Sequence, residues 1–368
     1  MNNKSNYVLI FLFFFIIGSL GLVTIIKEPE KISISERRDL KSIPKISLED
    51  IKDGKYFKNF ESFLLDQIPY RDKFRTLKSI NLFYIFRQKD NHKVFIKDDY
   101  ASQITYPLSL KHQNLLIKKI NYLSDNYFNK CNIYSTIIPD KAYYLVKNDE
   151  YPLIDYKNLR LKMKNSLPNY IDIFDELNIN SYYKTDTHWQ NQQLIPVAKK
   201  ILNSMDMRSS IIKINTKELS PFYGVLYGES ALPLKNDVIK YITTNEINNS
   251  KVYRMNKYTN KLEEGKMYYD ELINSNDPYD IFLGGASNIT LIDNTKVDNG
   301  KILYLFSDSF GRSLAPLLIS DYDKIVFVDL RYIKISSFTN DYEIKDGSDV
   351  LFAYSIQSIN VISNLQID

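Results

Sequence analysis

Cysteine and histidine are nearly absent from this chain of 368 residues, and their scarcity excludes several kinds of site. The single cysteine, Cys131, rules out an intramolecular disulfide and any cysteine-based zinc or iron–sulfur site. Only three histidines occur, His92, His112 and His188, which argues against a histidine-rich metal centre. We therefore expect no metal and no other cofactor.

Glycine and proline are also scarce, and neither sign of charge is in large excess. With 11 Gly and 12 Pro, the chain is neither collagen-like nor linker-like. The 48 basic and 44 acidic residues leave a net charge of only +4, spread along the sequence, so we expect no nucleic-acid partner. The 44% hydrophobic residues, with 29 Tyr and 20 Phe among them, supply the core of one large or two ordinary domains.

One long hydrophobic run lies near the amino terminus. Tyr7 to Ile26 contains no charged residue, and a helix rising ~1.5 Å per residue over this length spans the ~30 Å hydrocarbon layer of a bilayer. A cleaved signal peptide is the alternative, but its apolar region is usually about 7–15 residues long and ends at small residues. Residues 23–27 (Val-Thr-Ile-Ile-Lys) offer no such site, which favours an uncleaved anchor. Basic residues lie on both sides of the run, so their count does not orient it.

The rest of the chain alternates between helical and strand patterns. Because strands that alternate with helices form a largely parallel sheet covered by helices, we expect an α/β fold. Residues 209–277 break the rhythm and are interpreted as an insertion of hairpins and loops. The expected domains are a cytoplasmic tail (1–6), a transmembrane signal anchor (7–26), a stalk (27–50) and a catalytic domain (51–368). Helices are predicted within 53–88 (two, broken at Pro69), 110–129, 156–177, 191–205 and 311–320, and strands at 132–138, 178–183, 279–283, 301–306, 324–328 and 350–354.

Two loops carry residues suited to catalysis. In the first, Thr185-Asp186-Thr187-His188-Trp189, an Asp two residues before a His can fix the imidazole tautomer and leave the other ring nitrogen as a base. Taken alone, this loop better fits a histidine that caps a helix beside a core tryptophan. In the second, Ser307-Asp308-Ser309, a predicted strand turns into a helix, whose amino terminus can stabilise an oxyanion. Ser and Asp are also ordinary helix caps, so this loop alone is weak evidence.

The two loops together form a candidate triad. A serine nucleophile needs a base, and the base needs an orienting carboxylate. Both loops are predicted at the same edge of one sheet, where open α/β folds bind their ligands. His92 and His112 lie in polar contexts without such a serine turn and are expected to be ordinary surface histidines.

These residues resemble the SGNH-hydrolase-like proteins with a DHHW-type motif, which are similar to the alginate O-acetyltransferases of bacterial exopolysaccharide export. The resemblance rests mainly on Asp186-Thr187-His188-Trp189 followed by Asp308-Ser309-Phe310. It also includes Asp66-Gln67-Ile68-Pro69-Tyr70-Arg71-Asp72, Pro139-Asp140-Lys141, Phe282-Leu283-Gly284-Gly285 and Val328-Asp329-Leu330-Arg331-Tyr332. It implies an SGNH-hydrolase-like three-layer fold in permuted order, preceded by one transmembrane helix.

The resemblance implies roles for individual residues. Ser309 would be the nucleophile, His188 the general base and Asp186 its orienting partner. Because the base must be neutral to accept a proton, activity should fall at acidic pH, where histidine takes up a proton. Ser307 stands where SGNH enzymes usually have glycine, which puts the oxyanion hole in doubt. Further candidates for substrate binding or the oxyanion hole are Asp308, Asn288, Gly285, Trp189, Arg331 and Lys141. For Lys141 and Arg331 a salt bridge is the better interpretation, and the Gly284–Asn288 stretch equally fits a plain turn.

The resemblance also implies a function and a location. We expect a single-pass protein of the bacterial cytoplasmic membrane, held by residues 7–26, whose catalytic domain lies on the extracytoplasmic side. It would acetylate a polysaccharide acceptor with acyl groups supplied by a multi-pass membrane acyltransferase. Two alternatives stay open: an acetylesterase with the same triad, and a non-catalytic glycan-binding or scaffolding component of such a complex.

Overall fold

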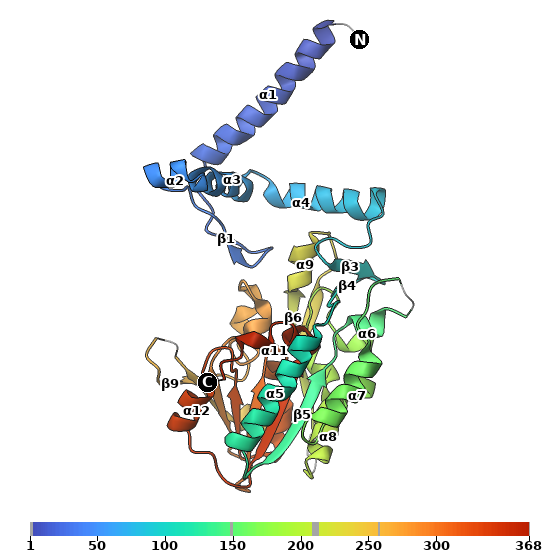
Figure 1. Cartoon of the computed structure of the whole chain (residues 1–368), viewed down its shortest axis with the longest axis vertical. Helices are drawn as coiled ribbons and strands as arrows, with labels where there is room; N and C mark the ends of the chain where they lie inside the picture. The colour runs from blue at the N-terminus through green and yellow to red at the C-terminus, as the bar shows by residue number, and fades with distance from the viewer. Residues whose placement is uncertain (1–2, 148–149, 208–212, 257, 368) are drawn as a thin grey trace. The chain divides into compact units, whose positions relative to one another are not determined.

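The structure is a computed structural model, and it describes residues 3–147, 150–207, 213–256 and 258–367. The chain forms two compact units (Figure 1). The first contains the described part of Met1–His92 together with Tyr227–Pro233, and the second contains the described parts of Lys93–Leu226 and Leu234–Asp368. Residues 51–92, grouped with the catalytic domain in the sequence analysis, thus lie in the first unit.

The first unit is mostly helical. Its elements are α1 (Asn3–Ile26), the short antiparallel strands β1 (Ile32–Ser33) and β2 (Arg38–Asp39), α2 (Leu48–Lys52), α3 (Lys55–Gln67), α4 (Arg71–Ile80) and the π-helical turn η1 (Asn81–Ile85). Within α1, the stretch Ser5–Ile26 is long and apolar enough to cross a membrane. The predicted break between α3 and α4 is confirmed, because Pro69 disfavours helical geometry at Ile68, which is extended with φ −57° and ψ 132°.

Charged residues of the first unit fold residues 27–50 against α3. The carboxylate of Asp66 accepts two hydrogen bonds from Arg38, at 2.9 and 2.6 Å, and one from the Lys41 N–H at 2.9 Å. The Gln67 side chain exchanges hydrogen bonds with the backbone of Glu30 at 2.8 and 2.9 Å. Asp66 and Gln67 therefore hold residues 30–41 against the end of α3, and the predicted stalk 27–50 is not a free linker.

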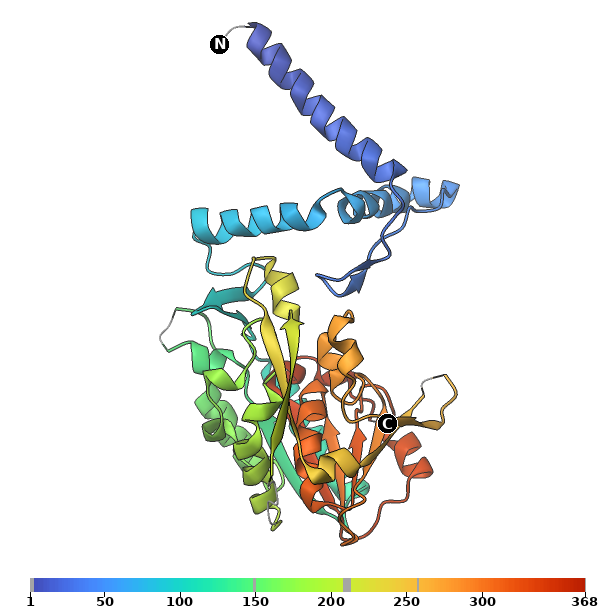
Figure 2. The same cartoon turned by 180° about the vertical axis from the view of Figure 1, so that it is seen from behind.

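The second unit is built on a seven-stranded sheet with the strand order β5-β13-β11-β12-β10-β8-β9. The first four of these strands pair in parallel and the last three add on antiparallel. Helices cover both faces of the sheet (Figures 1 and 2). The strands are β5 (Asn132–Ile138), β8 (Lys251–Met255), β9 (Leu262–Gly265), β10 (Ile289–Asp293), β11 (Ile302–Ser307), β12 (Lys324–Val328) and β13 (Asp349–Ser355).

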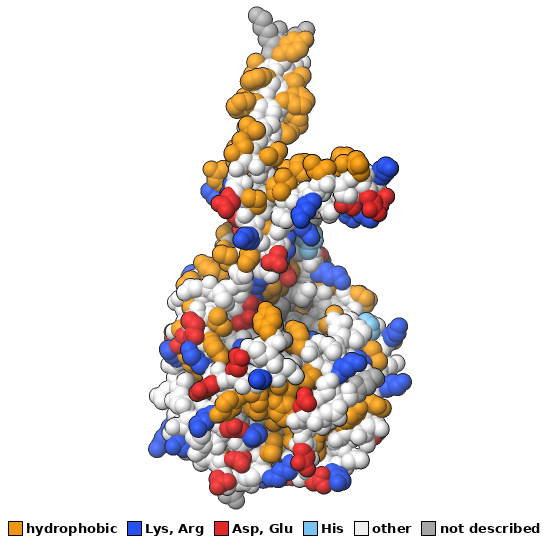
Figure 3. Space-filling view, turned by 90° about the vertical axis from the view of Figure 1, so that its left-hand side faces the viewer, with side chains coloured by type: hydrophobic (Ala, Val, Ile, Leu, Met, Phe, Trp, Pro, Cys, Tyr) orange, Lys and Arg blue, Asp and Glu red, His pale blue; other side chains and the backbone are white. Residues whose placement is uncertain are grey.

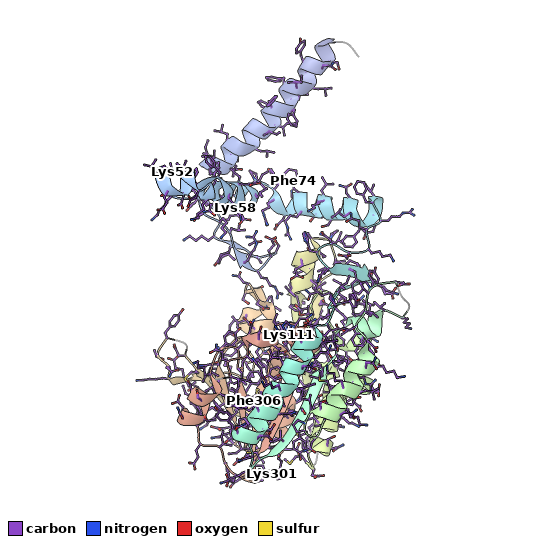
Figure 4. All side chains as sticks on the ribbon, viewed as in Figure 1. Lys52, Lys58, Phe74, Lys111, Lys301 and Phe306 are labelled. Atoms are coloured by element: carbon purple, nitrogen blue, oxygen red, sulfur yellow. The ribbon has the colours of Figure 1, made fainter. Side chains whose placement is uncertain are left out.

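Alternate residues of the central strands feed two separate cores. In β11, Leu303 and Leu305 pack with α8 (Ile195–Ser204) and α11 (Ser309–Leu318) on one face. Tyr304 and Phe306 point to the other face, among residues of α5 (Leu110–Asn126), α7 (Tyr156–Ser166), α12 (Ile335–Asp341) and α13 (Ile356–Ile359). Figure 4 labels Phe306 within this packed body. The period of two is that of a sheet buried on both sides, and the predicted three-layer α/β fold with an apolar amino-terminal helix is confirmed.

Smaller elements surround the sheet. These are the antiparallel pairs β3 (Val94–Lys97) with β4 (Tyr100–Gln103) and β6 (Asn215–Phe222) with β7 (Asp237–Thr243), and the short helices α6 (Ala142–Leu145), α9 (Val225–Ser230) and α10 (Asn245–Asn249). The expected insertion does contain a hairpin, β6–β7, but its β8 and β9 extend the main sheet instead of standing apart.

Several element predictions were wrong. Residues 178–183 and 279–283 are not strands but contain 3₁₀ turns, at Ile179–Ser181 and Pro278–Ile281, and the helix predicted over 156–177 ends at Ser166. Both false strands are short runs around fully buried aromatic residues, Tyr183 and Tyr279. A short apolar run does not by itself distinguish a strand from a buried turn. The true neighbouring strand, β10, was missed.

Candidate active site

Ser309 lies at the point where β11 turns into α11. Asp308 caps the helix, because its carboxylate accepts hydrogen bonds from the N–H of Phe310 at 3.0 Å and from the N–H of Ser355 at 2.9 Å. Asp308 is 2% exposed, so it positions the turn and is not a substrate ligand. From Leu303 to Tyr322, Ser309 is the only residue that is not buried. The strand and helix therefore present one hydroxyl to the outside.

The amino terminus of α11 also carries a candidate oxyanion donor. Ser309 is the first residue of the helix, so its N–H has no partner within the helix and lies at the positive end of the helix dipole. An N–H in this place is suited to the negative oxygen of a tetrahedral intermediate.

Ser307, the departure from the usual glycine, fits because of Gly311. The Ser307 hydroxyl donates to the carbonyl of Ala353 at 2.5 Å inside the sheet. A Cβ on Gly311 would lie only 2.3 Å from the Ser307 Oγ. The glycine one helical turn later thus leaves the space that the serine side chain occupies, and the turn keeps its shape.

His188 is held in a loop, and Trp189 ties this loop to α11. The indole Nε1–H of Trp189 donates to the carbonyl of Phe310 at 3.1 Å and to the hydroxyl of Ser313 at 2.9 Å. Trp189 is fully buried, so its part is structural and it does not bind substrate as considered from the sequence. Although the predicted strand before this loop is absent, the tryptophan still brings the loop to the nucleophile turn.

The structure brings the three predicted triad residues together. The Nε2 of His188 lies 2.8 Å from the Oγ of Ser309, and its Nδ1 lies 2.6 Å from the Oδ1 of Asp186. Since a carboxylate can only accept, Nδ1 carries the proton toward Asp186, and Nε2 is left to accept the serine proton.

Asp186 is fixed from several sides. It is fully buried, and its carboxylate also accepts the backbone N–H of His188 at 3.0 Å and that of Val225 at 2.8 Å. A Cβ on Gly224 would lie 2.4 Å from the Cβ of Asp186, so the close approach of this backbone requires a glycine. The orienting carboxylate therefore has little freedom to turn away from the imidazole.

Tyr279 is a site residue that sequence reasoning missed. Its ring stacks on the imidazole of His188, with centroids 3.8 Å apart and planes 10° from parallel. Its hydroxyl hydrogen-bonds with that of Ser313 at 2.7 Å, and burial keeps the pKa of the phenol far above its usual range. Tyr279 belongs to a run that we had interpreted as a strand, and no local pattern marks it as a neighbour of His188.

Lys141 corrects an expectation. It binds neither an anionic sugar nor a salt-bridge partner: the residue is 2% exposed, and its Nζ donates to the carbonyls of Tyr183 and Asp186, each at 2.7 Å. Burial lowers its pKa to about 7, against the opposing attraction of the Asp186 and Asp237 carboxylates. Lys141 thus holds the backbone of the loop that carries the triad acid and base.

The remaining predicted residues have local roles. Arg331 pairs with Asp329 at 2.6 Å, as the salt-bridge interpretation expected. The Asn288 side chain accepts the next N–H, that of Ile289, at 2.8 Å, and the Gly285 N–H donates to Phe282 at 3.2 Å. These bonds make a turn, the alternative that the sequence left open, and they engage the Gly285 N–H, which is therefore not an oxyanion donor.

Gly285 nevertheless supports the site indirectly. Its φ is +80°, and a Cβ there would lie 2.3 Å from the carboxyl carbon of Asp280. Asp280 pairs with Arg312 of α11 at 2.6 Å, and this guanidinium lies 5.8 Å from the ring centroid of Tyr279. The glycine thus leaves room for an ion pair beside the ring that stacks on His188.

Within the described residues, no group of three or more His, Cys, Asp or Glu side chains is arranged to hold a metal ion.

Comparison with known proteins identifies the fold. The sequence matches no family model and no curated protein. Among solved structures, it is similar to a DHHW family protein from Eubacterium siraeum, with 20% identity and a TM-score of 0.58 over 75% of this chain and 95% of that chain. It is also similar to Bacillus cereus PatB1 with a sulfonyl adduct, with 16% identity and a TM-score of 0.59 over 72% of this chain and 95% of that chain.

The chain is more weakly similar to the O-acetyltransferase domain of Pseudomonas putida AlgJ. The TM-score is 0.43 and the identity is 12%, over 75% of this chain and 93% of that chain. The resemblance inferred from the sequence is confirmed at the level of fold: over 75% and 72% of its length, this chain has the fold of the DHHW family protein and of PatB1.

Proposed function

We propose that this chain is a membrane-anchored O-acetyltransferase that modifies a polysaccharide outside the cytoplasmic membrane. The observation that carries the proposal is the continuous hydrogen-bonded series from Ser309 through His188 to Asp186, with distances of 2.8 and 2.6 Å. The likeness in fold to PatB1, which was solved with a sulfonyl adduct, supports it, because sulfonyl reagents react with activated nucleophiles.

The first half of the reaction loads the enzyme. The Oγ of Ser309 attacks the carbonyl carbon of a donor acetyl ester while Nε2 of His188 takes the serine proton. The N–H of Ser309 stabilises the oxyanion, and Asp186 stabilises the imidazolium that has formed. When the intermediate collapses, the bond from carbon to the donor oxygen breaks, and the donor leaves with the proton from His188.

The second half transfers the acetyl group. A sugar hydroxyl attacks the carbonyl carbon of acetyl-Ser309, and His188 accepts the proton of this hydroxyl. The bond to Oγ then breaks, and Ser309 regains the proton. The products are an acetylated sugar and the free enzyme, so no oxidant, metal or cofactor is consumed. We propose a multi-pass membrane acyltransferase as the source of the donor and α1 as the anchor.

Covalent labelling tests the nucleophile. The full-length protein should gain one sulfonyl group from phenylmethylsulfonyl fluoride, and peptide mass spectrometry should place it on Ser309. Ser309→Ala should lose the adduct, whereas Ser204→Ala, which removes an exposed hydroxyl of α8, should keep it. Equal labelling of wild type and Ser309→Ala would refute the proposed nucleophile.

Product analysis then separates transfer from hydrolysis. Incubation with an acetyl ester donor and an oligosaccharide should leave acetyl groups on the sugar, whereas an acetylesterase would release only acetate. Normal polymer acetylation in cells that carry only Ser309→Ala would instead favour a non-catalytic component.

A further inference from the structure

Helix α4 and the carboxyl-terminal end of α3 bury polar side chains and expose apolar ones, although Phe63 of α3 is also buried. Asp66, Gln67 and Ser79 are 9%, 5% and 2% exposed, whereas Phe74 and Leu77 are 46% and 56% exposed. A helix on a water-soluble domain has the opposite arrangement, with its apolar side against the core. The arrangement found here indicates that the medium outside these helices is not only water.

The buried polar side is fixed by specific bonds. Besides the contacts of Asp66 and Gln67 with residues 30–41, the Arg71 guanidinium pairs with Glu36, and that of Arg75 donates to the Gly228 carbonyl at 2.7 Å. Each of these partners belongs to the first unit. The helices therefore cannot turn their apolar side inward without breaking this network.

The exposed side is a continuous apolar stripe, which we call the apolar face: Tyr70, Phe74, Leu77, Tyr84 and Ile85. Phe74 and Leu77, three residues apart, lie on one side of α4, Tyr70 is the N-cap residue before it, and Tyr84 and Ile85 follow in η1. Tyr84 and Ile85 are 69% and 66% exposed. Hydrophobic side chains likewise cover α1, the column at the top of Figure 3. Phe74 is labelled in Figure 4.

Two exposed lysines of α4, Lys73 and Lys78, flank the stripe. A lysine at the edge of an apolar stripe can lay its stem along the apolar region and keep its ammonium group among anionic headgroups. An apolar stripe with basic edges is typical of helices that lie in the plane of a membrane interface.

We propose that the apolar face lies in the interfacial layer of a lipid bilayer, as a second membrane attachment beside α1. The argument for lipid as the occupant is continuity: α1, whose Ser5–Ile26 stretch is apolar enough to span a membrane, belongs to the same compact unit. Once α1 crosses the bilayer, the helices that follow within this unit lie next to its surface. The inference shares only the membrane anchor with the proposed function and does not depend on the triad.

Site-directed spin labelling of the full-length chain tests this proposal. With Cys131 replaced by Ser, nitroxides are placed at Phe74→Cys or Leu77→Cys in the stripe, at Asp72→Cys on the polar side of α4, and at Lys164→Cys in the second unit. The protein is reconstituted in vesicles of phosphatidylethanolamine with a minority of phosphatidylglycerol. Positions 74 and 77 should show high collision rates with oxygen and collision rates with a water-soluble nickel chelate several-fold below those at positions 72 and 164.

Two other outcomes would overturn the proposal. Equal accessibility of positions 72, 74 and 77 to the nickel chelate would show that the stripe lies in water and not in lipid. The candidate partner of the stripe would then be a membrane protein. Protection of 74 and 77 from both oxygen and nickel would mean that protein covers the stripe. Labelling of Ser309 by the sulfonyl fluoride in the same vesicles is a separate readout, so failure of the catalytic proposal would be distinguishable.

Discussion

At the scale of single residues, Asp186 is the clearest test of how the base is oriented. Asp186→Asn keeps the volume but presents a neutral amide to His188 Nδ1, so the histidine loses its preferred tautomer and the charge that stabilises its protonated form. Loss of the carboxylate in such triads costs about 10⁴ in kcat. The rate of hydrolysis of a chromogenic acetyl ester, measured from pH 5 to 8, should fall by about this factor in the variant. Circular dichroism should show that the fold of the variant is intact. A variant within a few-fold of wild type would remove Asp186 from the mechanism.

Tyr279 is predicted to position His188 by stacking. Tyr279→Ala removes the ring 3.8 Å from the imidazole, and the misplacement should lower kcat about 10²-fold. Tyr279→Phe keeps the ring and loses only the hydrogen bond to Ser313, so its loss should stay below about 10-fold. Tyr322→Phe, another buried tyrosine with a hydrogen bond, to Asp349, serves as control and should leave kcat unchanged. Equal losses for the Phe and Ala variants at position 279 would contradict a stacking role.

Lys141 should make stability depend on pH. Its pKa in the folded chain is about 7, below its ordinary value of 10.5, so the unfolded chain binds more protons between these values. Stability therefore rises with pH through this window, by at most ~1.4 kcal/mol per pH unit for one proton. Lys141→Met abolishes this slope, so the free energy of unfolding, measured with urea from pH 7 to 9, should rise less steeply than in wild type. The control Lys118→Met, on an exposed position, should keep the slope.

At the scale of elements, the turn between β11 and α11 depends on a matched pair, Ser307 and Gly311. Gly311→Ala places a methyl group against Ser307, and overpacking of this kind costs about 1–3 kcal/mol. The double variant Ser307→Gly with Gly311→Ala should regain part of this loss, although Phe327 still lies 2.9 Å from the added carbon. Urea unfolding of the two single variants and the double variant measures the coupling. Purely additive effects would show that the two residues do not compensate for each other.

The same elements show what could be predicted from the sequence. Strands β5, β11, β12 and β13 were placed within a residue or two, because each is an apolar run bounded by turn residues. The three residues that meet at the candidate site were predicted because Asp, His and Ser each stand in a loop pattern with a chemical reason. Tyr279 and Lys141 were missed or misjudged, since their roles depend on contacts with residues distant in the sequence, which no local pattern encodes.

At the scale of the whole molecule, the two units are joined by more than one connection. The chain passes from the first unit to the second after His92, returns for Tyr227–Pro233, and leaves again. Within the first unit, the returning segment is bound by Arg75 through the carbonyl of Gly228. The chain therefore crosses between the two units three times.

The final prediction concerns the side of the membrane on which the second unit lies. Basic residues on both sides of the apolar stretch Ser5–Ile26 do not settle the orientation. The proposed polysaccharide acceptor, however, lies outside the cell, and long domains are translocated largely regardless of such charges. With Cys131 replaced by Ser, a cysteine at Lys164, an exposed position of α7, should react with a membrane-impermeant maleimide in intact cells. A cysteine at Asn6 should react only after permeabilisation. The reverse pattern would place the triad in the cytoplasm, where no exported glycan reaches it, and the acceptor would then have to be a cytoplasmic hydroxyl compound.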